Sequence, residues 1–439
     1  MKVLKFGGTS VGSPSRMKGV AQLVINTGGK KVVVLSAVSG TTNALVEISE
    51  YHQKADLDGT LQKTRELRAK YDPFIEELLD SAALRQKATE IVDQYFAEME
   101  RLIRQPFREQ IAKLTVVFGE LISTNLFALY LQQIDYPQQL IAAVDFMYLN
   151  DSGDPDTPVI ESRLQAVLAN YETTATFITQ GFICRNADGG TDNLKRGGSD
   201  YSATLIGAAI KAEEVQIWTD IDGMHNNDPR VVDKTHPISR LSFDEAGELA
   251  YFGAKILHPT CIIPAQQHDV PVRIKNTMAP EAEGTLITSA KDPKGVKAIA
   301  AKSNITAIKV KSSRMIMAYG FLRRVFEVFE HHKTPIDMIT TSEIAVSLTI
   351  DDPTFLKEIT EEIQPFGHVE VDMDQTIICV VGEQIAESKG ISARIFDALR
   401  EVPLRMISFG GSKNNVSILV DTQYKEQSLK LLNKHLFDF

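Results

Sequence analysis

Val3-Leu4-Lys5-Phe6-Gly7-Gly8-Thr9-Ser10, close to the N-terminus, is an apolar run that leads into a glycine turn. The run predicts a strand, and the turn predicts the start of a helix. Glycine lets a backbone come close to a phosphate, and N–H groups at a helix N-terminus attract anions. A second turn, Arg196-Gly197-Gly198-Ser199-Asp200, precedes the helical run Tyr201–Ala212. Together the two turns favour a site that transfers a phosphoryl group, although either turn alone fits an ordinary strand-to-helix connection equally well.

The first half of the chain alternates between expected strands and helices. After Val3–Phe6, the pattern predicts a helix over Pro14–Asn26 and a wholly apolar strand over Lys31–Ser36. The polar stretch Asn43–Leu114 predicts a helical insertion or a lid. Further expected elements are the helices Glu120–Gln132 and Ser199–Ala212 and the strands Gln139–Val144, Ala175–Gln180 and Val215–Thr219. This alternation predicts an α/β fold, a three-layer αβα sandwich whose sheet is mostly parallel.

A repeat follows a boundary marked by the polar stretches Ala279–Gly284 and Lys291–Gly295. The segment Val346–Asp351 matches Val416–Asp421, seventy residues further on. Helices that open on Gly320 and Gly390 have the same offset. The expected strands are Ala307–Val310, Asp337–Thr341 and Ala345–Ile350 in the first copy, and Thr376–Val381, Leu404–Phe409 and Val416–Val420 in the second. Each copy therefore predicts a ferredoxin-like βαββαβ module.

The second copy has no fourth strand of its own, whereas the first has a candidate in Val369–Met373. Either Val296–Ala301 supplies the missing strand, so that the two modules interleave, or the second module has an open edge. Interleaving is the favoured alternative. The expected domains are residues 1–290, 296–375 and 376–439, with residues 296–301 donated to the third domain if the modules interleave.

Composition excludes several classes of protein. The net charge of −10 argues against a nucleic-acid or anionic-membrane binder. No apolar run reaches membrane-spanning length. Three widely spaced cysteines, Cys184, Cys261 and Cys379, fit a reducing compartment, and we expect a cytoplasmic protein. His331 and His332 are adjacent in an expected helix and should point to different sides, so no metal site is expected.

Four ordered motifs resemble those of aspartate kinases. They are Lys5–Val11, Lys195–Ser202, Phe252–Pro259, and Trp218–Gly223 with Asp228-Pro229-Arg230. The resemblance covers the whole chain, because aspartate kinases carry a C-terminal pair of ACT modules like the repeat above. It implies that ATP, with Mg²⁺, phosphorylates L-aspartate to give 4-phospho-L-aspartate and ADP. This is the first step of lysine, threonine and methionine biosynthesis.

The resemblance also assigns roles in catalysis and nucleotide binding. Lys5 is expected to neutralise the transferring phosphate, and Asp200 to orient the cations, although Asp200 also fits a plain helix N-cap. The nucleophile is a carboxylate, which is ionised at pH 7, so no general base is needed. The expected ATP-binding residues are Lys5, Gly7, Gly8, Thr9, Ser10, Thr219, Asp220, His225, Arg230 and Lys255. His225 stands where relatives often have tyrosine, and Trp218 is expected to belong to the core.

Substrate and effector residues follow in the same way. Ser36, Thr42, Glu120, Arg196 and Ser199 are expected to bind aspartate, with Glu120 on its ammonium group and Arg196 on its α-carboxylate. An inhibitory amino acid, with lysine the expected one, should bind near Met315, Ala318, Gly320, Phe321, Leu322, Asp337, Ser342 and Glu343. Asp337 and Glu343 fit a cationic side chain, but acidic residues at strand ends are equally often only solvated.

Two other readings compete with this one. Acetylglutamate kinase or glutamate 5-kinase would share the kinase fold, but these enzymes lack the Lys5–Ser10 pattern and the paired ACT modules. A non-catalytic amino acid sensor would not need Lys5, Glu120, Arg196 and Asp200 together. We also expect a homodimer, or a dimer of dimers, joined through the C-terminal modules.

Overall fold

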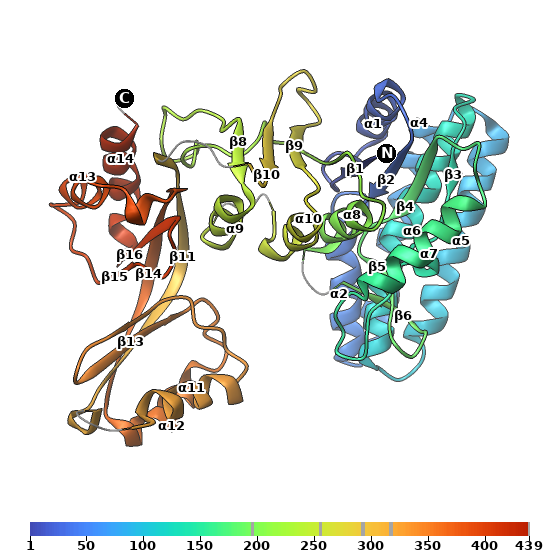
Figure 1. Cartoon of the computed structure of the whole chain (residues 1–439). Coiled ribbons are helices and arrows are strands. Elements are labelled where there is room, and N and C mark those ends of the chain that lie inside the picture. The colour runs from blue at the N-terminus through green and yellow to red at the C-terminus, as the bar shows by residue number, and fades with distance from the viewer. Residues whose placement is uncertain (195–196, 254–256, 291–294, 316–318, 438–439) are drawn as a thin grey trace. The chain divides into compact units, whose positions relative to one another are not determined.

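A computed structural model describes residues 1–194, 197–253, 257–290, 295–315 and 319–437 (Figure 1). The chain forms two compact units. The first unit holds residues 1–224, 239–243 and 257–290, and the second holds residues 225–238, 244–256 and 291–439. Each unit is described by itself.

The first unit is built on an eight-stranded sheet. In spatial order its strands are β3 (Gln139–Leu140), β4 (Thr176–Gln180), β2 (Lys31–Leu35), β1 (Lys2–Phe6), β7 (Glu214–Thr219), β9 (Val272–Asn276), β10 (Thr285–Thr288) and β8 (Arg240–Ser242). All neighbours are parallel except β9 and β10. Every residue of β2 is buried, as expected for a parallel strand covered on both faces. A hairpin of β5 (Ile183–Arg185) and β6 (Thr191–Asn193) lies apart from this sheet.

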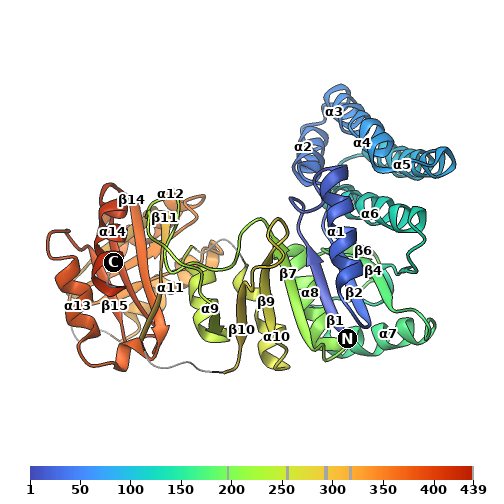
Figure 2. The same ribbon diagram turned by 90° about the horizontal axis from the view of Figure 1, so that it is seen from above.

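Helices cover both faces of the sheet. On one face α8 (Gly198–Ala209) packs against β1, β2 and β7, and α7 (Thr157–Ala169) and α10 (Ile263–Gln267) pack against α8. On the other face α6 (Glu109–Gln133) packs against β2, β3 and β4, with α1 (Pro14–Asn26) beside it. The helices α2 (Thr41–Gln53), α3 (Leu57–Ala69), α4 (Tyr71–Leu78) and α5 (Ala82–Ile103) form the insertion beyond α1 and α6 (Figure 2). The three-layer αβα architecture is confirmed.

Two expectations for this unit need correction. The strand expected over Gln139–Val144 ends at Leu140, and a 3₁₀ turn over Ala143–Asp145 follows. By length and composition α6 could cross a membrane, although no apolar run of that length was expected. Its apolar window is 78% buried within the first unit, as in the core helix of a globular domain.

The second unit contains a six-stranded antiparallel sheet. Its order is β12 (Ile339–Thr341), β13 (Ala345–Ile350), β11 (Gly295–Lys311), β14 (His368–Glu383), β16 (Asn415–Asp421) and β15 (Met406–Phe409). Its helices are α11 (Phe321–His331), α12 (Leu356–Ile363), α13 (Ile391–Ala398) and α14 (Lys425–Leu436). Residues Asp244–Tyr251 of α9 (Phe243–Tyr251) also belong to this unit.

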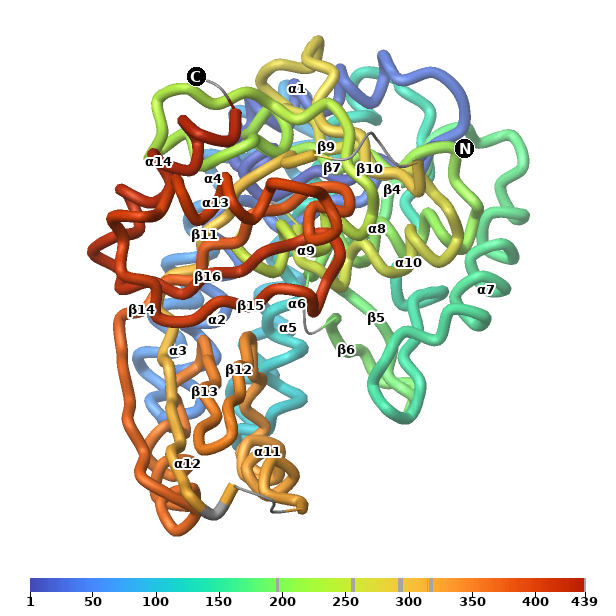
Figure 3. Tube along the Cα trace, turned by 60° about the vertical axis from the view of Figure 1, so that its left-hand side comes forward, coloured from blue at the N-terminus to red at the C-terminus, as the bar shows by residue number. Residues whose placement is uncertain are grey.

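Two long strands serve both repeats. β11 and β14 run side by side from the α13–α14 end to the α11–α12 end (Figure 3). Residues Val296–Ala301 of β11 pair with Ile378–Gly382 of β14, which belongs to the second repeat. The core at one end, here called the first module, contains Ile308 of β11 together with α11 and α12. The core at the other end, the second module, contains Ile299 of β11 together with α13 and α14.

Candidate active site

A buried ion pair connects the two glycine turns of the first unit. Nζ of Lys5, on β1, lies 2.6 Å from Oδ1 of Asp200, in the first turn of α8. Lys5 is only 8% exposed, so the pair lies in a medium of lower effective dielectric than water. The two expected catalytic residues are therefore brought together although 195 positions separate them in the chain.

Both glycine turns need residues without side chains. A Cβ on Gly8 would lie 3.0 Å from the carbonyl oxygen of Ala37, and one on Gly7 would lie 3.4 Å from Nζ of Lys5. Gly197 caps α8 with φ +71°, a left-handed conformation that favours glycine. The turns therefore bring backbone close to the Lys5 ammonium group and open α8 beside Asp200.

Glu120 is a buried carboxyl on α6 in the same unit. It is 4% exposed, and its Oε1 accepts a hydrogen bond from the Ala37 N–H at 3.2 Å. Its Oε2 has no hydrogen-bond partner among the described residues. Burial raises the pKa of Glu120 from 4.5 to about 7, opposed by the Ala37 N–H, by its own backbone and by the charge of Lys5. An unpaired, buried carboxylate oxygen fits a site that receives an ammonium group.

Three further substrate candidates belong to the first unit. Ser36 directly follows β2, and its carbonyl oxygen accepts a hydrogen bond from Ser123 of α6 at 2.7 Å. Ser199 is buried in the first turn of α8, and Thr42 is exposed in the first turn of α2. Arg196 lies outside the described residues.

Two of the expected nucleotide-binding residues, Ser10 and Thr219, are connected by hydrogen bonds through Thr277, a residue that the sequence motifs did not include. Oγ of Ser10 lies 2.7 Å from Oγ1 of Thr277, which in turn donates to the carbonyl oxygen of Thr219 at 3.0 Å. Thr277 directly follows β9, and that position at the carboxyl end of a strand was the available signal. Trp218 is 4% exposed and stacks on Phe6, which confirms it as a core residue.

The remaining nucleotide candidates divide between the units. Asp220 accepts a hydrogen bond from Thr219 at 3.2 Å in the first unit. Arg230 forms a two-pronged ion pair with Asp228 in the second unit, at 2.9 and 2.8 Å. His225, also in the second unit, lies 3.1 Å from Thr235 through Nδ1. Lys255 lies outside the described residues.

The expected effector residues that the structure describes lie on several elements of the second unit. Phe321 is buried in the core of the first module, with Met315 and Leu322 packed against it, and Gly320 caps α11. Ser342 and Glu343 are exposed in the turn between β12 and β13. Ala318 lies outside the described residues. Asp337 differs from these, because its side chain is only 1% exposed and lines a cavity of about 290 Å³.

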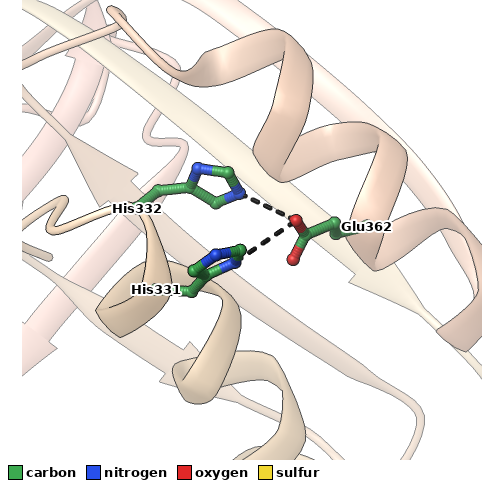
Figure 4. A group of neighbouring side chains, drawn as sticks. All are labelled: His331, His332 and Glu362. Carbon is green, nitrogen blue, oxygen red and sulfur yellow. Dashed lines mark hydrogen bonds and ion pairs between the residues drawn. The ribbon is translucent and has the colours of Figure 1, made fainter.

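His331 and His332 do not point to different sides. Nδ1 of His331 and Nε2 of His332 lie 3.4 and 3.0 Å from the same Oε1 of Glu362 on α12 (Figure 4). The expectation was wrong because α11 ends at His331, so His332 no longer follows the helical rotation. The three groups hydrogen-bond or pair with one another at the protein surface.

Comparison with known proteins extends these observations. The profile of the amino acid kinase family matches residues 1–276, and an ACT domain profile matches residues 378–436. The chain is 32% identical to lysine-sensitive aspartokinase 3 of Escherichia coli over 99% of both chains. It is 34% identical to chloroplastic aspartokinase 3 of Arabidopsis thaliana, over 99% of this chain and 81% of that one.

Solved structures agree with these relationships. The crystal structure of E. coli aspartokinase III with aspartate and ADP matches all of this chain with a TM-score of 0.86 at 32% identity. The same enzyme with lysine and aspartate matches with a TM-score of 0.81, over 100% of this chain and 99% of that one. The family profile, the full-length relatives and the matching fold show that this chain belongs to the aspartokinases of the amino acid kinase family.

Proposed function

We propose that this chain transfers the γ-phosphoryl group of ATP to the side-chain carboxylate of L-aspartate, giving 4-phospho-L-aspartate and ADP. The observation that carries the proposal is the buried Lys5–Asp200 pair between two glycine turns. A relative with 32% identity over the full length binds aspartate and ADP.

The residues of the first unit supply positioning and charge. The aspartate carboxylate attacks the γ-phosphorus, and the bond to the β–γ bridging oxygen breaks, so that ADP leaves with the bonding electrons. Lys5 neutralises charge on the transferring group, and Asp200 holds the Lys5 ammonium in place. The open oxygen of Glu120 accepts the substrate ammonium group, while Arg196 grips the α-carboxylate.

Mg²⁺ fits this site as a companion of the nucleotide. Asp200 pairs with Lys5, and among the described residues of the first unit no group of three or more carboxylate, histidine or cysteine side chains lies close enough to hold a metal ion. Mg²⁺ commonly keeps most of its ligands from phosphates and water, with one or two carboxylates from the protein. Asp200 is the residue that would hold it, and the ion would supply neutralisation of the phosphate charge.

We further propose regulation and assembly through the second unit. An amino acid, lysine in the first instance, inhibits by binding near Asp337, and the E. coli relative binds lysine. Two copies of the chain, or two such pairs, associate through the ACT modules. The three cysteines are all free and buried, which supports a reducing compartment such as the cytoplasm.

Substrate choice tests the proposal. Purified protein with ATP should release ADP with L-aspartate and not with L-glutamate or N-acetylglutamate. Preference for either glutamate compound would favour another member of the amino acid kinase family, and the absence of turnover with all three would favour an amino acid sensor.

A further inference from the structure

His331, His332 and Glu362 form a compact group of metal-binding side chains in the first module (Figure 4). His331 is the last residue of α11, His332 follows it, and Glu362 lies in the last turn of α12. One ligand atom from each residue lies within 4.8 Å of the other two. Imidazole nitrogens and carboxylate oxygens are the ligands that Zn²⁺ and related divalent transition ions take in proteins. None of the three residues has a part in the proposed phosphoryl transfer.

The spacing of the three ligand atoms matches a tetrahedral ion. Nδ1 of His331 and Nε2 of His332 lie 3.4 and 3.0 Å from Oε1 of Glu362. Metal–ligand distances of about 2.0–2.1 Å give a tetrahedron with edges of roughly 3.3 Å, which is close to both distances. Adjacent histidines can converge here because one uses the ring nitrogen near its Cβ and the other uses the nitrogen at the tip of its ring. An ion can therefore replace the hydrogens that these groups share, with little movement of the side chains.

The structure around His332 holds its ring in place. The His332 N–H donates to the carbonyl oxygen of Val328 at 3.1 Å, and the hydroxyl of Thr334 donates to the carbonyl oxygen of His332 at 3.2 Å. The His332 side chain is only 12% exposed, and its ring centre lies 5.7 Å from that of Phe355. His332 is therefore a restrained ligand that loses little conformational entropy when an ion binds.

The two helices that carry the ligands pack against each other. Their buried apolar residues belong to one core, which contains Val328 and Phe329 of α11 and Ile359 and Ile363 of α12. This packing fixes the distance between the two backbones that present the ligands. The side chains of His331 and Glu362 are exposed, so an ion can reach the site from solvent. An ion bound here would link the end of α11 to the end of α12.

We propose that His331, His332 and Glu362 bind one divalent transition ion, Zn²⁺ in the first instance, and that this ion links α11 to α12. The described residues supply three ligands, so water takes the fourth position of the tetrahedron. Mg²⁺ is not expected here, because it prefers oxygen ligands in an octahedral arrangement. The site therefore does not compete for the Mg²⁺ that accompanies ATP, and the inference does not depend on the proposed function.

Zn²⁺ binding by the full-length protein tests the proposal. Protein that has been freed of metal with EDTA is titrated with Zn²⁺ in a calorimeter. Loss of a direct ligand should weaken binding at least as much as loss of a residue that supports a ligand, which is roughly 10- to 100-fold. We expect this loss in His331→Ala, His332→Ala and Glu362→Gln. His368→Ala is the matched control, because His368 is an exposed histidine of the second unit that lies 4.0 Å from Glu370, and it should bind Zn²⁺ like the wild type.

Two further measurements report the geometry and the link between the helices. Four-coordinate Co²⁺ absorbs visible light much more strongly than octahedral Co²⁺, so the wild type and His368→Ala should show this absorption and the three ligand variants should not. Zn²⁺ should slow hydrogen exchange in α11 and α12 of the wild type, because an ion that binds only the folded module stabilises it. Mg²⁺ at the same concentration should not slow this exchange.

Several results would overturn the inference. Zn²⁺ affinity that is unchanged in His331→Ala and Glu362→Gln would place any bound ion elsewhere, and this holds even if His332→Ala fails to fold, because the other two side chains lie at the surface. Absence of Zn²⁺ binding by the wild type, or equal affinity for Mg²⁺, would also overturn it. Zn²⁺ bound by these residues without slower exchange in α11 and α12 would contradict the link between the helices.

Discussion

Lys5 is the residue on which the proposed chemistry depends most. Its ammonium group is buried and held 2.6 Å from Asp200, so it is oriented before ATP arrives. Loss of such a preorganised charge costs about 10²-fold or more in rate. Lys5→Ala should lower kcat by at least that factor, measured by ADP release. Lys18→Ala, at a half-exposed lysine of α1, is the control, and near-normal turnover by Lys5→Ala would remove Lys5 from catalysis.

Glu120 predicts a pH dependence for aspartate binding. Its pKa is raised to about 7, and only the ionised carboxylate can pair with the substrate ammonium group. The KM for aspartate should rise as the pH falls below about 7, approaching tenfold per pH unit, while the KM for ATP changes little. A flat aspartate KM between pH 6 and pH 8 would contradict the assignment.

The raised pKa of Glu120 also predicts that ionisation of its carboxyl, which aspartate binding requires, lowers the stability of the folded protein. The pKa is about 7 in the folded state and 4.5 in the unfolded chain, so the folded state binds more protons between these values. The contribution of Glu120 to stability is present below pH 4.5 and is lost as the pH rises through about 7, a difference of roughly 3 kcal/mol. Glu120→Gln should therefore raise the Tm of the ligand-free protein at pH 8, while raising the aspartate KM by about 10- to 100-fold. A lower Tm at pH 8 would show that the charged form is stabilised after all.

At the scale of single elements, β11 serves two hydrophobic cores. Ile308 lies in the core of the first module and Ile299 in that of the second. Ile308→Ala should cost about 2–5 kcal/mol. Because the same strand continues into the second module, hydrogen exchange should also increase around β16 and not only around β13. Faster exchange confined to the first module would show that the modules unfold independently.

The elements that the sequence predicted are those with an uninterrupted pattern. Strands β1 and β2 are mostly apolar, and α1 begins with Ser13 as a capping residue and Pro14 in its first turn, so the expected helix bounds agree with the structure. β11 and β14 were each expected as two strands. Both contain polar residues at their centres, with Asn304 and Asp374 at positive φ, and register shifts flank Ile305. Such positions look like turns in a sequence, and only pairing over the full length keeps the strand continuous.

In the candidate site too, the local patterns could be predicted from the sequence, whereas the contacts between distant residues could not. The glycine turns and Lys5 form local patterns, but the partnership of Lys5 with Asp200 depends on the parallel order of β1 and β7, which no local pattern contains. The contact between Tyr251 and Asp337, 86 positions apart, had no sequence signal at all. A tyrosine on a helix and an aspartate before a strand are common, and only the fold of the second unit brings them together.

At the scale of the whole molecule, inhibition requires reciprocal coupling between the two units. If lysine weakens aspartate and nucleotide binding by some factor, then these substrates must weaken lysine binding by the same factor. Calorimetric lysine binding with and without aspartate plus a non-hydrolysable ATP analogue measures this. Lysine affinity that is independent of both substrates, in an enzyme that lysine inhibits, would contradict a binding equilibrium between two arrangements.

Formation of an acyl phosphate on L-aspartate is measured most directly by trapping the product with hydroxylamine. Wild-type protein incubated with ATP, Mg²⁺ and L-aspartate should yield the β-hydroxamate of aspartate in a one-to-one ratio with the ADP released. Lys5→Ala should reduce both products together. ADP release without hydroxamate, or hydroxamate formed on the α-carboxylate, would contradict phosphoryl transfer to the aspartate side chain.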